Sequence, residues 1–424
     1  MQEALIALAL RRAGYGTLEE FLSARGLSGS EPAEVALTPY LLGYDLVRVR
    51  SGDTFSAVAR QAGTTVRAVE VANPGVDPRQ LRIGQLLVVP YDFSVVPEDT
   101  PMTSELMRYV LRGLQARYPF MRLSTIATTA YGRRVERVRL GTGPRRVYYN
   151  AAHHANEWIT ATALCWCLEQ YARAAAFGEK IQGEDAAKLL RDTTLELVPL
   201  VNPDGVDLVN GAVTETELAS ARQIAEDFPS IPFPEGWKAN LRGVDLNLNY
   251  PAKWDQAREI KFSQGYNAPA PRDYVGEAPL SEPESRAMFD TTEEFDPDLV
   301  IAWHTQGKEI YWKFLDMEPP GAQALGMEMA SASGYQLENV PYASGFAGYK
   351  DWFIQDFGRP GYTIEAGIGE NPLPLSQLPD ILRDNLPIFL LGLTGGNPEE
   401  WETQPMQQDQ ETFEENSAAQ ETWG

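Results

Sequence analysis

His154-Ala-Asn-Glu157 and the later His304 are the residues of this chain whose types and spacing best suit metal chemistry. Two neutral imidazoles and one carboxylate form a Zn²⁺ ligand set that leaves a fourth position open for water. The spacing of three places His154 and Glu157 about one helical turn apart, so both can face one ion. The chain has three histidines, and His153 would point away from its neighbour on an extended backbone. His304 is therefore the candidate third ligand.

Apolar segments precede both candidate histidines. Residues 146–152 form a strand-like run that ends just before His154, and residues 298–303 form a second buried run that ends at His304. Residues 158–164, which follow Glu157, have a helical pattern. Ligands at strand ends, with helices between the strands, are typical of the carboxyl edge of an open α/β sheet. This setting disfavours the alternative of two unrelated surface histidines.

Six motifs occur in the order found in zinc metallocarboxypeptidases related to carboxypeptidase A, which the chain resembles over roughly residues 100 to 395. The motifs are His154-Ala-Asn-Glu157-Trp158, Asn202-Pro-Asp-Gly205, Gly243-Val-Asp-Leu-Asn247, Glu282-Pro-Glu284, His304 and Tyr362-Thr-Ile-Glu365. The resemblance implies an α/β fold: an α/β/α sandwich around a mixed, mostly parallel eight-stranded sheet. It also implies that His154, Glu157 and His304 hold one zinc ion per chain.

Glu365 ends a short β-rich run after a Gly-Arg-Pro-Gly turn. Burying an unpaired carboxylate at the end of a core strand is costly, so such a residue indicates a function. Beside a zinc-bound water it would take the water's proton and pass it to the leaving amine. The resemblance implies this general-base role, and the alternative is a solvated glutamate at a strand end.

Other residues are candidates to support the metal and the reaction. A zinc-bound histidine usually donates its second ring N–H to a carboxylate, and the resemblance gives Asp245 that role toward His154. An ordinary turn aspartate is the alternative. The resemblance also implies a cation that stabilises the oxyanion, for which spacing favours Lys238 over Arg242. The resemblance further implies that Tyr342 is the family's mobile active-site tyrosine.

The candidate substrate contacts include one departure from the family pattern. Carboxypeptidases grip a free C-terminal carboxylate with an arginine that follows the Gly-Val-Asp-x-Asn segment, but here Leu248 follows Asn247. The chain therefore resembles the endopeptidase subgroup that cuts γ-D-glutamyl-(L)-meso-diaminopimelate bonds. Asn156 and Asn247 are further candidate substrate contacts. Lys350 suits the distal carboxylate of diaminopimelate, with a solvated loop lysine as the alternative.

Residues 44–91 carry a second pattern, a strand, two short helices and a strand. The stretches Val-Arg-Ser-Gly-Asp-Thr, Ala-Asn-Pro and Leu-Arg-Ile-Gly-Gln-Leu-Leu-Val-Val-Pro resemble a LysM module. The resemblance implies binding to glycan that contains N-acetylglucosamine, and a generic small α+β domain is the alternative. The candidate glycan-binding residues are Gly52, Asp53, Thr54, Asn73 and Pro74.

Composition limits the classes of partner. The 424 residues suit two or three domains, and 43% hydrophobic residues can bury a sizeable core. The net charge of −23 disfavours nucleic acid and anionic membranes as partners. Cys165 and Cys167 lie two apart on a predicted helix, where they cannot readily form a disulfide. No run reaches the ~18 apolar residues of a transmembrane helix.

The remaining segments complete the predicted domain organisation. Residues 1–43 read as helical, 92–101 as a short, stiff linker, 102–396 as the peptidase and 397–424 as an acidic, disordered tail. The N-terminal apolar run lacks the preceding positive charge of a signal peptide. We therefore expect a bacterial protein that is cell-wall associated or released to the wall without a recognisable signal, and a cytoplasmic location stays open.

The two modules suggest one function. A glycan-binding module would raise the local concentration of wall peptide at a peptidase. The sequence predicts a zinc peptidase that cuts the γ-D-glutamyl–(L)-meso-diaminopimelate bond of peptidoglycan. Peptidoglycan is the predicted partner, with its glycan bound by the LysM module and its stem peptide bound at the zinc site. The alternatives are a carboxypeptidase or amidase acting on free muropeptides, and a non-catalytic wall-binding protein.

Overall fold

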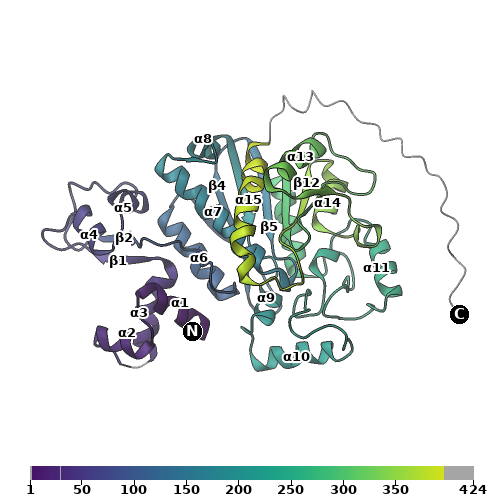
Figure 1. The fold of residues 1–424 in the computed structure, drawn as a ribbon, viewed down its shortest axis with the longest axis horizontal. Coiled ribbons are helices and arrows are strands. Elements are labelled where there is room, and N and C mark those ends of the chain that lie inside the picture. Colours follow the sequence, from purple (N-terminus) through teal and green to yellow (C-terminus); the bar gives the residue numbers. More distant parts are fainter. Residues whose placement is uncertain (1, 29, 396–424) are drawn as a thin grey trace, which may run out of the picture.

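A computed structural model describes residues 2–28 and 30–395 of the chain. A helical N-terminal segment and a small β-containing unit lie at one side of a much larger α/β unit (Figure 1). The predicted acidic tail, residues 397–424, lies outside the described residues.

The large unit is built on an eight-stranded mixed sheet, as predicted. The strand order is β11-β10-β12-β9-β5-β8-β4-β3, with parallel pairing at the centre and antiparallel pairing toward the β3 edge. The strands are β3 (Arg122–Thr128), β4 (Arg134–Gly141), β5 (Arg145–Ala151), β8 (Thr193–Val198), β9 (Leu299–His304), β10 (Glu309–Tyr311), β11 (Gln336–Glu338) and β12 (Gly361–Glu365). The predicted metal ligands therefore follow or end central strands.

Helices cover both faces of this sheet, because the central strands are apolar on both sides. In β5, Val147 and Tyr149 belong to one buried cluster while Tyr148 belongs to the other, as alternation along a strand requires. The first cluster includes α6 (Ser104–Arg117), α7 (Ile159–Phe177), α8 (Ala186–Asp192), α13 (Ala322–Ser333) and α15 (Leu378–Thr394). The second includes α11 (Trp254–Ser263), α12 (Pro283–Phe295) and α14 (Tyr349–Phe357).

Shorter elements build the connections around the sheet. They are the helices α9 (Pro203–Val209) and α10 (Glu215–Ala225), the short 3-10 helices η1 (Ala155–Glu157), η2 (Leu246–Leu248), η3 (Tyr342–Ser344) and η4 (Leu375–Gln377), and the small hairpin of β6 (Lys180–Ile181) and β7 (Glu184–Asp185). Both cysteines lie on α7, buried and unpaired, as predicted. Among the described helices, none is long and apolar enough to span a membrane.

The small unit has the predicted strand-helix-helix-strand order. Antiparallel β1 (Tyr44–Arg48) and β2 (Leu86–Pro90) flank α4 (Phe55–Gln61) and α5 (Val66–Ala72). Thr54 caps α4 by accepting a hydrogen bond from Ala57 N–H, and Gly63 follows the helix with φ of 67°. Before this unit, α1 (Glu3–Ala13), α2 (Leu18–Arg25) and α3 (Ser30–Leu42) form the helical segment, whose apolar side joins the core of the large unit.

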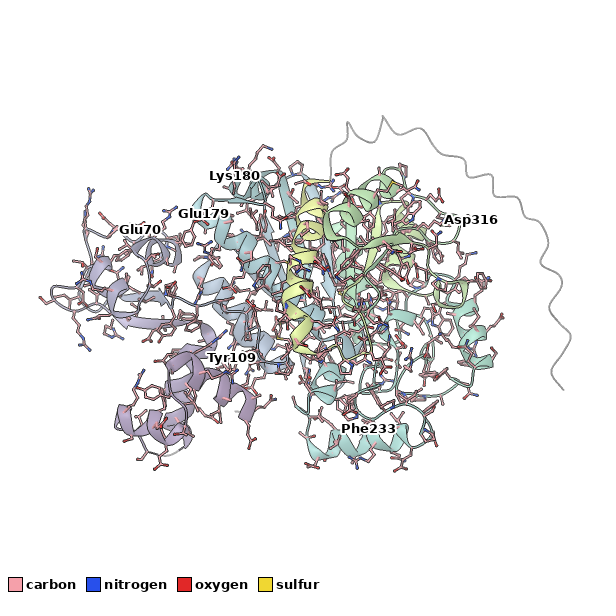
Figure 2. The ribbon with its side chains drawn as sticks, in the orientation of Figure 1. Glu70, Tyr109, Glu179, Lys180, Phe233 and Asp316 are labelled. Carbon is pink, nitrogen blue, oxygen red and sulfur yellow. The ribbon has the colours of Figure 1, made fainter. Side chains whose placement is uncertain are left out.

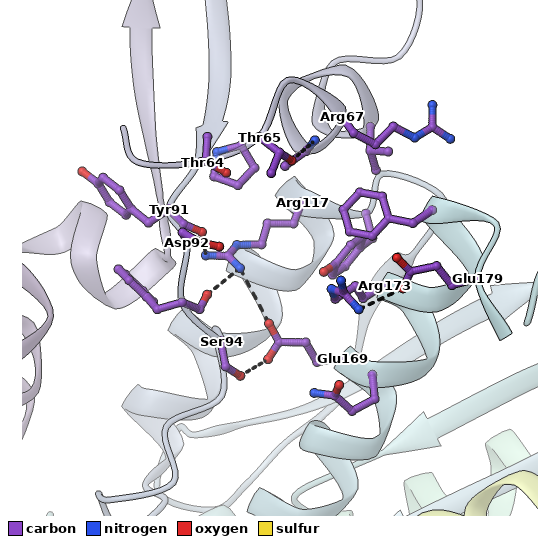
Figure 3. A pocket seen from close by; sticks show the side chains of 17 residues that line it. Thr64, Thr65, Arg67, Tyr91, Asp92, Ser94, Arg117, Glu169, Arg173 and Glu179 are labelled. Carbon is purple, nitrogen blue, oxygen red and sulfur yellow. Dashed lines mark hydrogen bonds and ion pairs between the residues drawn. The ribbon is translucent and has the colours of Figure 1, made fainter. Parts of the chain in front are cut away.

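The segment between the two units is held by buried charges. Arg117 of α6 donates to the carbonyls of Gly43, Tyr91 and Phe93, and its ion-pair partner is Glu169 of α7 (Figure 3). Figure 2 shows Glu70 on α5 and Glu179 just after the end of α7, and at this junction Arg67 of α5 donates to the Ala176 carbonyl of α7. These bonds hold the chain that follows β2 against α6 and α7.

Candidate metal centre

Two central strands bring the predicted ligands together. His154 comes three residues after β5, His304 ends the adjacent strand β9, and Glu157 lies on η1 just after His154. Glu157 Oε1 lies 2.9 Å from His154 Nδ1, and Glu157 Oε2 lies 2.9 Å from His304 Nδ1. One ligand atom from each residue falls within 4.8 Å of the others. Parallel pairing of β5 and β9 therefore creates the cluster, since 147 residues separate Glu157 from His304.

The donor set fits a zinc ion. The two Nδ1 atoms lie 3.2 Å apart. Two nitrogens bound at about 2.0 Å to one tetrahedral ion lie roughly 3.3 Å apart. On the far side of the ring, His154 Nε2 lies 3.2 Å from Asp245 Oδ1, the predicted partner. That contact orients the imidazole so that Nδ1 faces Glu157 and His304.

The electrostatics of the cluster favour a cation. Burial lowers the pKa of His154, but the Glu157 carboxylate outweighs burial and raises it to about 9. Burial raises the pKa of Glu157, yet His154 and Lys238 hold it well below its usual range. Glu157 is thus an ionised carboxylate in a buried place. The same field that draws a proton to His154 attracts a metal ion.

His153 lies outside the ligand cluster, as the sequence predicted. It is fully buried, its Nε2 lies 2.9 Å from the Tyr250 hydroxyl, and burial lowers its pKa well below the ordinary value. Its ring stacks 5.8 Å from that of His304. His153 therefore packs beneath the site and helps to place β9.

Glu365 and Lys238 face the same cleft as the ligands. The cleft has a volume of about 680 Å³, and its lining includes His154, Glu157, His304, Lys238 and Glu365. Burial and the nearby Glu157 raise the pKa of Glu365 to about 8, whereas a bound cation favours the ionised form. Lys238 Nζ lies 3.1 Å from Glu157 Oε1.

Arg242 does not line this cleft. It is about half exposed, and its nearest acidic partner is Glu282, at 3.7 Å. The geometry therefore favours Lys238, as the spacing did.

Comparisons with known proteins agree with this geometry. The sequence profile of the zinc carboxypeptidase family matches residues 107–388. The chain belongs to this family. A LysM domain matches residues 47–90. The chain is 42% identical to gamma-D-glutamyl-L-diamino acid endopeptidase 1 of Lysinibacillus sphaericus, over 72% of each chain. It is 34% identical to the uncharacterized protein YqgT of Bacillus subtilis, over 76% of this chain and 83% of that one.

Solved structures of zinc carboxypeptidases share the fold. Carboxypeptidase A from Helicoverpa armigera superposes with a TM-score of 0.54 at 19% identity, covering 89% of this chain and 84% of that chain. Bovine thrombin-activatable fibrinolysis inhibitor superposes with a TM-score of 0.55 at 16% identity, covering 70% of this chain and 98% of that chain. The chain thus has the fold of the zinc carboxypeptidases, and its membership of the family makes it a zinc metallopeptidase.

Within this zinc carboxypeptidase fold, Leu248 and Lys350 both line the cleft. Leu248 ends η2 and is 9% exposed, so it presents an apolar surface. Lys350, on α14, is only 3% exposed and lies 2.6 Å from Asp351 Oδ1. Its Nζ also donates to the Lys313 carbonyl at 2.7 Å. The Lys350 ammonium therefore already has two partners inside the protein.

The remaining predicted contacts lie in different settings. Asn156 lines the cleft and donates to the Glu235 carbonyl, and Asn247 lines it while accepting from Tyr349 N–H. Tyr342 is 69% exposed on η3 and packs edge-on to Phe346, 5.0 Å away. It lines an adjacent hollow with Lys313 and Asp351 rather than the metal cleft.

Sequence reasoning missed three groups at the centre. Asn371 Nδ2 donates to Glu157 Oε1 at 3.4 Å, and Thr305 N–H donates to Glu157 Oε2 at 3.3 Å. Arg272 lines the cleft from the loop between α11 and α12. Thr305 directly follows the ligand His304 in the sequence, so its place at the metal centre could have been predicted. Loop packing alone places Asn371 and Arg272.

In the LysM unit, the candidate glycan contacts divide in two. Gly52, Asp53 and Thr54 form the turn before α4, where Asp53 accepts from Arg50 N–H. Asn73 is buried, where it donates to Val69 and Val88 carbonyls and accepts from Val88 N–H. Pro74 follows it at the surface. The Asn73 side chain thus ties α5 to β2.

Proposed function

We propose that this chain hydrolyses the γ-D-glutamyl–(L)-meso-diaminopimelate bond of peptidoglycan stem peptides, with one zinc ion per chain. The observation that carries the proposal is a full ligand set beside Leu248, where an exopeptidase of this family needs an arginine. A leucine cannot pair with a free C-terminal carboxylate. The 42% identity to an enzyme named gamma-D-glutamyl-L-diamino acid endopeptidase 1 supports the same bond class.

The side chains around the ligands divide the work of hydrolysis. A bound zinc ion supplies a Lewis acid and makes a bound water more acidic. Glu365 faces the same cleft and would accept the proton of the attacking water, then deliver it to the leaving amine. Lys238 would stabilise the negative charge that develops on the carbonyl oxygen. Asp245 would hold the His154 ring in its ligating orientation.

The LysM unit would deliver this site to its substrate. We infer that it binds glycan containing N-acetylglucosamine, with Gly52, Asp53, Thr54 and Pro74 at the exposed turns. Because Arg117 and Glu169 fix the connecting segment, glycan held by the unit would stay within a limited reach of the metal cleft. The proposed place of action is the bacterial cell wall.

Digestion of defined muropeptides, followed by mass spectrometry, tests the bond. We expect cleavage between D-Glu and diaminopimelate even when the diaminopimelate is linked onward to D-Ala. Plain L-peptides should release single C-terminal residues poorly. An Arg–carboxylate hydrogen bond contributes on the order of 1.5–3 kcal/mol, and Leu248 provides none of it. Efficient stepwise trimming of plain peptides would instead support the carboxypeptidase alternative, and intact substrate would support a non-catalytic binding protein.

A further inference from the structure

Four lysine or arginine side chains line the metal cleft among the described residues, and they differ in how far they are already paired. They are Lys238, Lys261, Arg272 and Lys350. An anionic stem peptide that enters this acidic chain needs a cation to hold it, since the protein carries a net charge of −23. The question is which of the four is available.

The three lysines are committed to partners inside the protein. Lys238 lies 3.1 Å from Glu157, and its side chain is 18% exposed. Lys261 lies 2.6 Å from Asp273, and the Lys261 side chain is 11% exposed. Lys350 is 3% exposed and is held by Asp351 and a backbone carbonyl. Recruiting Lys261 or Lys350 to a substrate carboxylate would strip a carboxylate or a carbonyl of its partner, which is costly in a buried place. Lys238 is already assigned to the carbonyl oxygen of the scissile amide.

Arg272 differs because its side chain is 40% exposed and only one of its nitrogens is engaged. Its Nε donates to Asp273 Oδ2 at 2.7 Å. Its two terminal nitrogens make no hydrogen bond to the residues that the structure describes. A guanidinium presents its donors as a planar fork that matches a carboxylate. Arg272 therefore keeps one pair of donors free at the cleft.

Asp273 fixes the direction of this fork. Its other carboxylate oxygen is held by Lys261, and its N–H donates to Asp245 Oδ2 at 3.1 Å. Asp245 in turn contacts the ligand His154. A short chain of hydrogen bonds thus ties Arg272 to the metal centre, so its position is set before substrate arrives. A preorganised cation binds with a smaller entropy loss than a free surface arginine.

We propose that Arg272 is the residue that anchors a substrate carboxylate next to the scissile amide, in place of the arginine that Leu248 replaces. This proposal rests on the proposed function, because it assigns the anchor to a γ-D-glutamyl–diaminopimelate substrate. When the L-centre carboxylate of diaminopimelate is in amide linkage, as in a stem that continues to D-Ala, two carboxylates flank the scissile amide: the α-carboxylate of the D-glutamyl residue and the distal carboxylate of diaminopimelate. Both offer the same bidentate chemistry.

The test compares kcat/KM of wild type and Arg272→Gln on three tripeptides. The parent is L-Ala-γ-D-Glu-meso-diaminopimelate with the L-centre carboxylate of diaminopimelate amidated, and the other two carry a second amide at the D-glutamyl α-carboxylate or at the distal diaminopimelate carboxylate. Arg272→Gln should lower kcat/KM on the parent about 10- to 100-fold, mainly through KM. On the tripeptide whose amide replaces the anchored carboxylate, wild type and variant should agree. That tripeptide identifies which carboxylate binds.

Controls separate anchoring from a structural role. Arg286→Gln changes an exposed arginine on α12 outside the cleft and should leave kcat/KM unchanged. Arg272→Lys keeps the charge but loses the fork, so it should fall between wild type and Arg272→Gln. Equal losses on all three tripeptides, or lost zinc, would show that Arg272 only supports the fold. No loss on the parent would also overturn the proposal.

A binding measurement keeps the proposal testable apart from turnover. The zinc-loaded Glu365→Gln protein should bind the parent tripeptide about 10- to 100-fold more tightly than Glu365→Gln/Arg272→Gln does. Equal affinities would reject the anchor even if wild type cleaves the bond. If wild type leaves the tripeptide intact but this difference in affinity holds, the proposed reaction fails and the anchor stands.

Discussion

The connection between the units and the metal centre both bury charge, but they satisfy it differently. At the connection, Glu169 accepts from Ser94 Oγ, Val95 N–H and Val96 N–H at 2.6 to 3.0 Å. Arg117 donates to three backbone carbonyls. Each buried charge there meets groups that are fixed in place, as a structural ion pair requires.

At the metal centre the charged and polar groups face one another instead. The two Nδ1 atoms lie 3.2 Å apart beside the Glu157 carboxylate, and His304 Nε2 has no hydrogen-bond partner among the described residues. Glu365 lines the cleft beside these ligands. Buried groups whose lone pairs converge suit a metal and a reaction, whereas groups that are fully bonded suit a fold. This contrast predicts different consequences of mutation at the two places.

Loss of a metal ligand should have the largest effect. His304→Ala should remove zinc and peptidase activity together, because the ligand set then has only two members. Zinc content by mass spectrometry and hydrolysis of the parent tripeptide measure both. His153→Gln, a change at the buried histidine outside the cluster, is the matched control and should keep its zinc. Full zinc and turnover in His304→Ala would refute the ligand assignment.

Changing Glu365 should separate chemistry from metal binding. Glu365→Gln keeps the shape of the side chain but cannot accept a proton, so zinc should stay near one per chain. The rate should fall by ~10²- to 10⁴-fold, the usual range for loss of a general base. Single-turnover rates and zinc content on the same sample test this. Near-normal turnover would mean that Glu365 has a structural role.

Mutation of the buried ion pair at the connection should lower stability and leave peptidase activity in place. Glu169→Ala leaves Arg117 buried without its carboxylate and should lower the free energy of unfolding by about 3–5 kcal/mol. Hydrolysis of a short tripeptide should persist under native conditions. Arg173→Ala is the matched control, because its pair with Glu179 is about half exposed and contributes roughly 0–1 kcal/mol. Denaturant unfolding measures the free energy of unfolding of both variants. Equal losses would show that the buried Arg117–Glu169 pair contributes no more than the exposed Arg173–Glu179 pair.

The sequence predicted the groups that lie close to strand ends and to recognisable motifs. His154, Glu157, His304 and Glu365 could be predicted because parallel strands deliver their carboxyl ends to one edge. The eight-stranded sheet followed from the same family motifs. Asp245 was predicted as a partner of His154, and its 3.2 Å contact agrees.

The sequence did not predict which side chains pair with one another. Lys350 was assigned to a substrate carboxylate, but no spacing reveals that Asp351 and the Lys313 carbonyl hold it. Asn73 was predicted as a glycan contact, but no local pattern reveals that its side chain is buried and makes three hydrogen bonds to Val69 and Val88. Arg272 lies 115 residues after Glu157 and reaches the cleft through a loop. Long-range packing decides which charges are free, and local patterns do not record it.

Glu284 falls between the two kinds of buried charge and sharpens the comparison. It lies on α12 with 1% exposure, and neither carboxylate oxygen has a hydrogen-bond partner among the described residues. Burial raises the pKa of Glu284 to about 8. Its neighbour Glu282 instead accepts from Asn240 at 2.8 Å and Ser281 at 3.1 Å. Glu284 thus has neither the partners of Glu169 nor the converging ligands of Glu157.

This environment gives a pH dependence of stability with a definite sign. The folded pKa lies above the ordinary glutamate value, so above about pH 4.5 the unfolded chain releases a proton that the folded chain retains. Stability should therefore fall as pH rises from there to about 8, by at most about 1.4 kcal/mol per pH unit. Glu284→Gln should remove this contribution. Urea unfolding at pH 6 and pH 7 measures it as the difference between wild type and variant, in which other titrating groups cancel. Identical pH dependences would show that Glu284 is ionised in the fold and has partners equivalent to those of Glu169.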